Sequence, residues 1–410
     1  MSRAALALTL ALTLLITECW AAQDIKLAWA KDRWCNPSLV EYHGDHISAA
    51  KTTDFKRKRE TTWWINSLFM CSGRSSSNLS CTPFHPWRSR FSECTFDKRV
   101  RAGKVDVAGL GDVKLWVWPG KGVYAIFGRK PQRSSKSHSC TDLIVYHQWL
   151  AQVRADPLLP ASDPWNLAAR DPLALLPTGS NHTYSKDATF VMEKNWMPFV
   201  YKDMASQEEQ LLVTYMVHPH MIYQLHPNGS ATHMWTTRNN TLMQRFQRFD
   251  VHGGPPIVYV PPYLARGSAY YLGIMHHIER FDGGRTRLYR HFAYKTATQP
   301  PFAIQAISDE LPLVYNQTYT VRSAFVAFVT GLHVSTEGVV SITYGSADIE
   351  SRLLTMTVTE LESLFTGNVY FRPINVAASL AAVNAAVSPA ARRGLLQAAT
   401  VTSEGPEYGV

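Results

Sequence analysis

Charged residues are scarce in this chain. Asp, Glu, Lys and Arg together make up 18% of its 410 residues, whereas hydrophobic residues make up 46%. A disordered chain has the opposite composition, with much charge and few apolar residues, so disorder of the whole chain is excluded. The length is sufficient to bury a substantial core, as one large domain or two ordinary ones.

Motifs of several common enzyme classes are missing. The chain contains no G-x-S-x-G, no H-E-x-x-H and no phosphate-binding P-loop. These absences argue against a serine hydrolase, a zinc protease and a P-loop NTPase. Two Gly-Gly pairs, Gly253-Gly254 and Gly283-Gly284, are predicted to lie in turns, with no helix after them.

Dense charge of one sign is almost absent, although the net charge is +9. The only basic run is Lys56-Arg57-Lys58-Arg59, which is more typical of a solvated loop than of a nucleic-acid site. The sequence therefore predicts no nucleic-acid partner, while an anionic ligand remains compatible with the overall charge.

Cysteine is rare, and all six cysteines lie in the first 140 residues. No pair has C-x-x-C spacing and no histidine stands at zinc-site spacing from one, so no metal site is predicted. In an oxidising compartment the five cysteines after Cys19 predict two disulfides and one odd thiol. Cys71–Cys81 is the one pair we expect, although connectivity cannot be deduced from sequence alone.

The N-terminus resembles a secretory signal peptide. Arg3 precedes an apolar run from Ala4 to Ile16, followed by small residues near Ala21 and Ala22. The run is shorter than the ~20 residues of a membrane-spanning helix, so we expect cleavage of residues 1–22 and no transmembrane span afterwards. Five N-x-[ST] sequons agree with secretion or residence in the ER or Golgi lumen: Asn78, Asn181, Asn228, Asn239 and Asn316.

Strand patterns fill most of the remaining chain. Aromatic residues make up 11% of it, which suits an all-β protein or one that stacks flat ligands. Four stretches each predict two strands around a turn: residues 114–127, 199–217, 256–275 and 326–345. We expect one domain over residues 23–372, with a Pro-rich surface excursion at residues 155–180 and an Ala-rich, partly disordered tail at residues 373–410.

A polar motif accompanies each predicted hairpin. The first hairpin begins with the motif "GLGDVK", which contains Asp112 and Lys114; the second is preceded by "EKNWMPF", the third by "HGGPP", and the fourth ends in "YGSADIESR". This repetition is typical of a β-propeller, in which equivalent strand ends converge on a central cavity. Asp112, Asn195, Gly254 and Asp348 should then lie together. A β-sandwich is the alternative architecture.

The first motif, "GLGDVKLW…GKGVYAIFG", resembles a divergent form of the G-x-E-D-P-R motif of the five-bladed β-propeller mannoside phosphorylases and their β-mannosyltransferase relatives. Five further motifs resemble, in the same order, those of related glycosyltransferase-like proteins: "EKNWMPF", "VHPHMIYQL", "YLGIMHH", "YRHFAYKTATQPPFAIQAIS" and "ITYGSADIESR". The resemblance covers residues 105–365. It implies a five-bladed propeller, with an irregular, disulfide-bearing segment N-terminal to it that completes the ring.

The resemblance also implies a chemistry. In the phosphorylases the aspartate of the first motif supplies a proton through a sugar hydroxyl, while Arg, Lys and His side chains hold the attacking phosphate. The matching residue is Asp112, which we expect to be the catalytic acid/base. The motif departs from the family pattern, with Gly111 for glutamate, Val113 for proline and Lys114 for arginine. An ammonium cannot clamp a sugar bidentately as a guanidinium does.

Other polar residues near the predicted strand ends are candidates for binding sugar or phosphate. Trp196 could stack on a pyranose, but a tryptophan in a β-rich core is equally ordinary. His276 and His277 should point to opposite faces of one strand, so at most one faces a shared cavity. The full candidate set for substrate binding is Lys114, Asn195, Trp196, His220, His276, His291, Asp348, Glu350 and Arg352.

The last three candidates have a simpler interpretation. Asp348, Glu350 and Arg352 alternate along a strand and could form only an ion pair at its rim. Asp348-Ile349-Glu350 resembles a D-x-D metal-nucleotide motif, but three residues are too few to predict a metal.

The leading hypothesis is a secretory-pathway enzyme that transfers or cleaves a mannose-like glycosyl unit and needs no bound cofactor. Its donor would be a sugar phosphate or a nucleotide sugar, and its partner a carbohydrate or glycan. The altered residues around Asp112 support an alternative, a catalytically inactive propeller that binds glycans as a lectin-like module.

Overall fold

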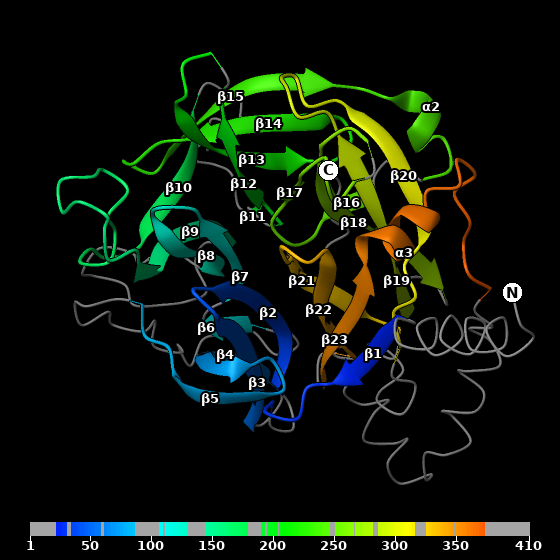
Figure 1. The fold of residues 1–410 in the computed structure, drawn as a ribbon. Coiled ribbons are helices and arrows are strands. Elements are labelled where there is room, and N and C mark those ends of the chain that lie inside the picture. The colour runs from blue at the N-terminus through cyan, green and yellow to red at the C-terminus, as the bar shows by residue number, and fades with distance from the viewer. Residues whose placement is uncertain are drawn as a thin grey trace, which may run out of the picture.

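A computed structural model describes residues 22–30, 34–58, 61–86, 106–109, 111–129, 144–178, 190–192, 195–203, 205–246, 251–265, 267–281, 286–315, 325–347 and 350–373. Nearly all elements in these ranges are strands, so the predicted all-β class is confirmed (Figure 1). The predicted signal peptide, apart from Ala22, and the tail beyond Pro373 lie outside the described residues.

The strands form antiparallel meanders that follow one another along the chain. The first meander contains β2 (Trp34–Tyr42), β3 (Asp45–Lys58), β4 (Thr61–Ser75) and β5 (Asn78–Pro83), with β6 (Asp106–Gly109) parallel to β4. The second contains β7 (Lys114–Trp118), β8 (Gly122–Arg129), β9 (Ile144–Ala155) and β10 (Leu173–Thr178), with β11 (Phe190–Met192) parallel to β9.

Three further meanders complete the described part. The third contains β12 (Met197–Lys202), β13 (Glu209–Met216), β14 (His220–Leu225) and β15 (Ser230–Thr237). The fourth contains β16 (Val251–Gly253), β17 (Val258–Val260), β18 (Tyr270–Phe281), β19 (Thr286–Thr296) and β20 (Ile304–Glu310). The fifth contains β21 (Ala327–Val334), β22 (Val339–Ser346), β23 (Glu350–Thr357) and the N-terminal β1 (Gln23–Lys26). Two short helices, α2 (Asn240–Met243) and α3 (Val358–Ser363), follow β15 and β23.

The meanders close on themselves. β1 comes from the N-terminal end of the described chain and pairs antiparallel with β23, near its C-terminal end. Elsewhere β10 pairs parallel with β15, which joins the second and third meanders into one sheet of nine strands. Figure 1 shows the meanders arranged in chain order around a common centre.

The hydrophobic core is divided among the seams between meanders. In the described residues, five larger clusters of buried side chains each lie between two meanders that follow one another. Leu115 and Ala49 lie in the cluster between the first and second meanders, and Trp118 and Leu211 in the one between the second and third. Leu353 and Leu39 close the circle between the fifth and first. Burial of these side chains is what holds neighbouring meanders together.

All four predicted hairpins are confirmed: β7–β8, β12–β13, β17–β18 and β21–β22. Successive side chains of a strand point to opposite faces of the sheet, and each face packs against a different neighbouring meander. This explains the alternating pattern of these strands. The β7–β8 turn needs Gly120, whose φ is +71°, a backbone conformation that is costly for a residue with a side chain.

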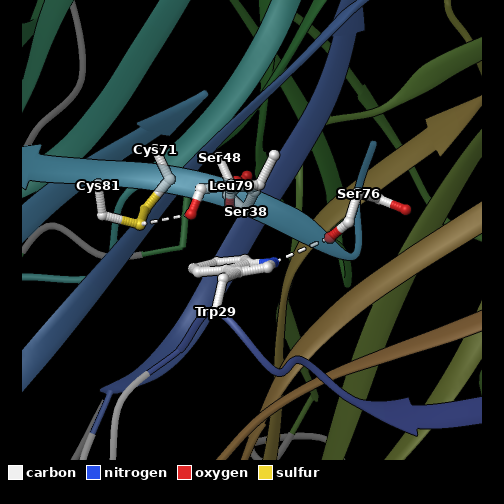
Figure 2. Close-up of a disulfide and its surroundings, with 7 residues drawn as sticks. All are labelled: Trp29, Ser38, Ser48, Cys71, Ser76, Leu79 and Cys81. Atoms are coloured by element: carbon white, nitrogen blue, oxygen red, sulfur yellow. Dashed lines mark hydrogen bonds between the residues drawn. A yellow bond between two sulfur atoms is a disulfide. The ribbon is translucent and has the colours of Figure 1, made fainter. Parts of the chain in front are cut away.

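The prediction of an irregular N-terminal segment is wrong. Residues 34–83 form the regular first meander, whose long β3 ends in a basic run and whose β4 ends in Gly and Ser, so neither shows a clear alternating pattern. The predicted Cys71–Cys81 disulfide is present and links directly opposed residues of β4 and β5. Figure 2 shows it beside the Trp29 indole, which donates a 2.9 Å hydrogen bond to the Ser76 carbonyl. Cys94 and Cys140 lie outside the described residues, and Cys35 is buried.

The Pro-rich stretch at residues 155–180 is only partly a surface excursion. Residues 156–172 contain no strand, but they carry the buried Trp165 and Leu167 into the core, and residues 173–178 form β10. The Tyr124 hydroxyl donates to the Trp165 carbonyl at 2.7 Å, which fixes the excursion on the second meander. Proline suppressed the strand signal in the sequence because it lacks a backbone donor. No helix in the described residues is both long and apolar enough to span a membrane.

Candidate active site

Asp112 lies immediately before β7, where the first and second meanders meet. Its carboxylate oxygen Oδ1 accepts a 2.7 Å hydrogen bond from the Asn36 amide and lies 2.5 Å from Nζ of Lys51. Asn36 belongs to β2 and Lys51 to β3, so two strands of the first meander hold a side chain of the second. The Asp112 side chain is 31% exposed, and a ligand could therefore reach it.

The surroundings of Asp112 favour its ionised form. Burial alone would raise the pKa of the carboxyl, but the ammonium of Lys51 and the Asn36 amide outweigh it, with a smaller contribution from Lys114. The pKa of Asp112 is therefore below its ordinary value. A carboxyl in this state is ionised at neutral pH and accepts hydrogen bonds.

Asn36 is itself held tightly. It is 2% exposed and has a φ of +51°, a conformation that asparagine adopts more readily than most residues. A Cβ added to Gly345 would lie 1.9 Å from its Oδ1, so the glycine on β22 is what leaves room for the amide. The fifth meander thus also supports the position of Asp112.

Lys114 is buried between the second and third meanders. It is 2% exposed, and Nζ donates a 3.2 Å hydrogen bond to the Trp196 carbonyl at the start of the third meander. Burial lowers the pKa of Lys114 to about 7, an effect that Asp112 partly offsets. In this structure the side chain links the two meanders, and its role in holding sugar stays a prediction.

Asn195 and Trp196 precede β12, in a tight junction with the fourth meander. Asn195 has a φ of +60°, and a Cβ added to Gly253 would lie 2.4 Å from its carbonyl oxygen. The Trp196 side chain is fully buried and meets Tyr215 edge-on, with ring centroids 5.4 Å apart. The prediction that Trp196 stacks on a sugar is therefore wrong in this structure, because neither ring face is open.

A row of three histidines crosses the fourth meander. His252 on β16, His276 on β18 and His291 on β19 are direct partners in the strand register, with centroid distances of 5.4 and 5.5 Å between neighbouring rings. His276 and His291 are 1% and 0% exposed. Within the described residues, Nδ1 of His276 and both ring nitrogens of His291 lack a partner in hydrogen-bonding geometry.

The imidazoles of His276 and His291 are neutral. Burial lowers the pKa of His291 to about 3 and holds the pKa of His276 well below its ordinary value. Lys114 is close enough to contribute to the lowered pKa of His276. The histidine row therefore lies beside the segment that contains Asp112 and Lys114. A neutral imidazole can donate to or accept from a sugar or phosphate oxygen.

His276 and His277 point to opposite faces of β18, as predicted. His276 contacts the row and Phe328 of the fifth meander, whereas His277 packs against Phe246 and Phe371. His220, a further candidate, lies away from the row. It contacts Tyr294, which belongs to the cluster between the third and fourth meanders.

The remaining candidates bind the first strand rather than a ligand. Arg352 donates a 2.8 Å hydrogen bond to Asp24 of β1, and Glu350 lies 3.6 Å from Lys26 of the same strand. The simpler interpretation, an ion-pair network at the rim, therefore applies to this pair. Asp348 lies outside the described residues. In the ranges that are described, no group of three or more His, Cys, Asp or Glu side chains could hold a metal ion.

The structure brings together Asp112, Lys114, Asn195, His276 and His291, and adds residues that sequence reasoning missed. These are Asn36, Lys51 and His252. The Asn36-Pro37 pair is a turn signal that could have suggested an unusual backbone, but Lys51 stands in an ordinary strand pattern. Only the pairing of β2 with β3 and the approach of β7 show that they meet Asp112.

We expect Lys51, rather than Lys114, to control the ionisation of Asp112. Lys51→Met should raise the pKa of the Asp112 carboxyl more than Lys114→Met, because Lys51 is in direct contact and contributes the larger lowering. The measurement is an NMR titration of protein labelled with ¹³C at the aspartate carboxyl, with Asp112→Asn to assign the signal. A larger change in Lys114→Met would contradict this assignment.

Comparisons with known proteins give a likeness of fold. No family model and no curated protein matches the sequence. A glycosyl hydrolase from Bacteroides ovatus superposes with a TM-score of 0.51 at 11% identity, over 80% of this chain and 85% of that one. The β-1,2-mannobiose phosphorylase from Listeria innocua, in complex with β-1,2-mannobiose, superposes with a TM-score of 0.50 at 10% identity, over 85% and 94% of the two chains. Over most of its length, the chain is therefore similar in fold to these two carbohydrate-active enzymes.

Proposed function

We propose that the protein is a carbohydrate-active enzyme of the secretory pathway that transfers or cleaves a mannose-like unit, with Asp112 as its acid/base group. The observation that carries this proposal is the Asp112 carboxylate, which is ionised, 31% exposed and held by Asn36 and Lys51 beside the neutral His276 and His291. Chemistry at a glycosidic bond needs a positioned carboxyl and donors for sugar or phosphate oxygens. The fold shared with a glycosyl hydrolase and a mannobiose phosphorylase supports the same conclusion.

The architecture proposed for this enzyme is a five-bladed β-propeller. Five meanders in the described residues, each in contact with the next through its own hydrophobic cluster, are the expected blades. Pairing of β1 with β23 would close the ring, as the terminal strands do in a propeller. The start of β7 would then face the central cavity.

The ionised state of Asp112 is the state in which a transfer step would begin. A direct general acid needs a raised pKa, whereas the pKa of Asp112 is lowered. As a base, the carboxylate takes the proton of an acceptor hydroxyl, directly or through a sugar hydroxyl. The acceptor oxygen then forms a bond to C1 of the donor sugar, and the bond from C1 to the leaving phosphate breaks with its electron pair on the phosphate. In cleavage, the same carboxyl must first be protonated, which Lys51 opposes.

A lectin-like module remains the second candidate, because one observation favours it. Lys51 and Asn36 already satisfy Oδ1 of Asp112, so the carboxylate could serve only to orient sugar hydroxyls. Incubation with mannose 1-phosphate, nucleotide sugars and a panel of acceptors separates the two functions. An enzyme forms a new glycoside and releases phosphate or nucleotide, whereas a lectin-like module binds the sugars unchanged.

Passage through the secretory pathway makes a separate prediction. The mature chain should begin near Ala22 or Gln23 and carry N-glycans at the exposed Asn78 and Asn228, which lie at or beside strand turns. Asn239 is a poorer acceptor, because its amide donates to the Ile304 carbonyl and its Oδ1 accepts from Leu242. Intact-mass analysis of the secreted protein, with and without glycosidase, checks this. Asn228→Gln should remove one glycan, while recovery of Met1 with no glycan would show the compartment to be wrong.

A further inference from the structure

A cavity lies at the outer part of the seam between the third and fourth meanders. We call it the seam cavity; its volume is about 80 Å³. Its walls come from the β13–β14 turn, the end of β15, α2 and the start of β20 (Figure 1). The lining residues are Val217, His218, His220, Thr237, Arg238, Asn239, Met243, Ala303 and Ile304.

His220 supplies a buried imidazole to the wall of this cavity, and the Phe302 backbone is close enough to this ring to raise its pKa slightly. The side chain is 3% exposed, and its Nε2 shares a 3.2 Å hydrogen bond with the Thr214 hydroxyl. Nδ1 has no partner in hydrogen-bonding geometry among the described residues. Burial lowers the pKa of His220 to about 4, so the ring is neutral. A ligand atom that hydrogen-bonds to Nδ1 would therefore remove an unfavourable buried polar atom.

The charge of the lining selects the ligand group. Arg238 is the only residue of the wall that is always charged, and neither Asp nor Glu lines the cavity. The Asn239 side chain fixes this wall, because it bridges the Leu242 amide and the Ile304 carbonyl. The cavity is too small for a whole sugar and suits a compact oxyanion group such as a carboxylate or phosphate.

A wider pocket continues from the seam cavity and shares His218 and Met243 with it. We call this the outer groove; its volume is about 420 Å³. Asn240, Thr241 and Gln244 give it amide and hydroxyl groups, while Met243 and Phe246 give it an apolar wall. Such a combination suits a sugar ring, which has hydroxyl groups at its edges and apolar C–H faces.

We propose that the seam cavity and the outer groove together bind a small acidic sugar, with its oxyanion group beside His220 and Arg238 and its ring in the outer groove. The site is separate from the one around Asp112. His220 of the third meander and Tyr294 of the fourth lie in the seam between these two meanders, whereas His276 and His291 lie on the side of the fourth meander that faces the fifth, next to Phe328.

Calorimetric titration of the full mature chain tests the proposal with three probes. Glucuronate and glucose 6-phosphate carry the two kinds of oxyanion group, and glucose carries none. We expect saturable binding of at least one acidic probe and none of glucose at the same concentration. The acidic probe that binds more tightly shows whether the site recognises a carboxylate or a phosphate.

Variants assign the binding to this cavity. Arg238→Gln should lower the affinity for the acidic probe by about tenfold or more, since hydrogen bonds to charged groups contribute about 1.5–3 kcal/mol. Arg74→Gln makes the same change at a side chain that is 83% exposed on the first meander and should have no effect. Asp112→Asn should leave affinity for the probe at the wild-type value.

Three results would overturn the proposal. They are equal binding of glucose and the acidic sugars, wild-type affinity in Arg238→Gln, and the absence of saturable binding up to millimolar concentration. Loss of binding in Asp112→Asn would place the acidic sugar at the candidate active site. None of these measurements requires turnover, so the proposal stands or fails independently of the proposed enzyme activity.

Discussion

Asp112→Asn is expected to lower glycosyl transfer by about 100- to 10,000-fold, the range that a well-placed acid/base group contributes. Asparagine keeps the size of the side chain and can still hydrogen-bond to Asn36, but it cannot accept a proton. Sugar binding should therefore survive while turnover is lost. The measurement is product formation from mannosyl donors, with binding followed by calorimetry.

The matched control is Asp45→Asn. Asp45 also pairs with two cations, Arg74 and Arg154, but it lies at the exposed β2–β3 turn. Its replacement should leave turnover within a factor of about two, because exposed ion pairs contribute little. Unchanged turnover in Asp112→Asn would remove Asp112 from the mechanism. If the wild type has no turnover with any donor but binds sugars, the lectin-like function is the correct one.

Stability should fall steeply as the pH drops from 7 to 5. The folded-state pKa values of His220 and His291, about 4 and about 3, lie below the unfolded value of about 6.5. The unfolded chain therefore binds more protons in this window, and stability that is fully present above pH 6.5 is lost towards the folded-state values. The loss is about 2 kcal/mol at pH 5 for each of these two residues, and His276 acts in the same direction.

Urea unfolding at pH 5, 6 and 7 measures this loss. His291→Phe should reduce the difference between pH 7 and pH 5 by about 2 kcal/mol, because it removes one buried imidazole. His233→Phe is the control, since this ring lies exposed on β15. A free energy of unfolding that is the same at pH 7 and pH 5 would show that the imidazoles are accessible to protons in the folded chain.

The sequence predicted strands correctly where the two faces of a strand pack against two different meanders. The four predicted hairpins have clear alternation and turn residues such as Pro119-Gly120, and all four exist. The first meander was missed because β3 ends in a basic run and β4 in Gly and Ser, which mask the pattern. β10 was missed because Pro177 and the Asp-Pro pairs before it signal a loop.

The candidate site was predictable only in part, because its contacts join residues far apart in the chain. The polar motif correctly drew attention to Asp112, at the junction of two meanders. Its partners Asn36 and Lys51 lie 76 and 61 positions earlier, in a segment without a recognisable motif. Trp196 illustrates a different failure. Its type suggested a ligand contact, but the direction of a side chain depends on which face of the strand a neighbouring meander covers.

Closure of the meanders by β1 has a consequence for how the protein is made. The Asp24 carboxylate meets Arg352, which is 328 positions later. At ~5–20 residues per second, a ribosome needs roughly 16–66 seconds to travel that distance. Throughout that interval β1 has no partner strand, and the first meander has one side uncovered. A chaperone that holds nascent chains, or slow release of the N-terminal segment, would protect this edge until β23 emerges. Mutations that weaken the Asp24–Arg352 contact should therefore lower the yield of native protein after synthesis. The free energy of unfolding of the finished fold should change comparatively little.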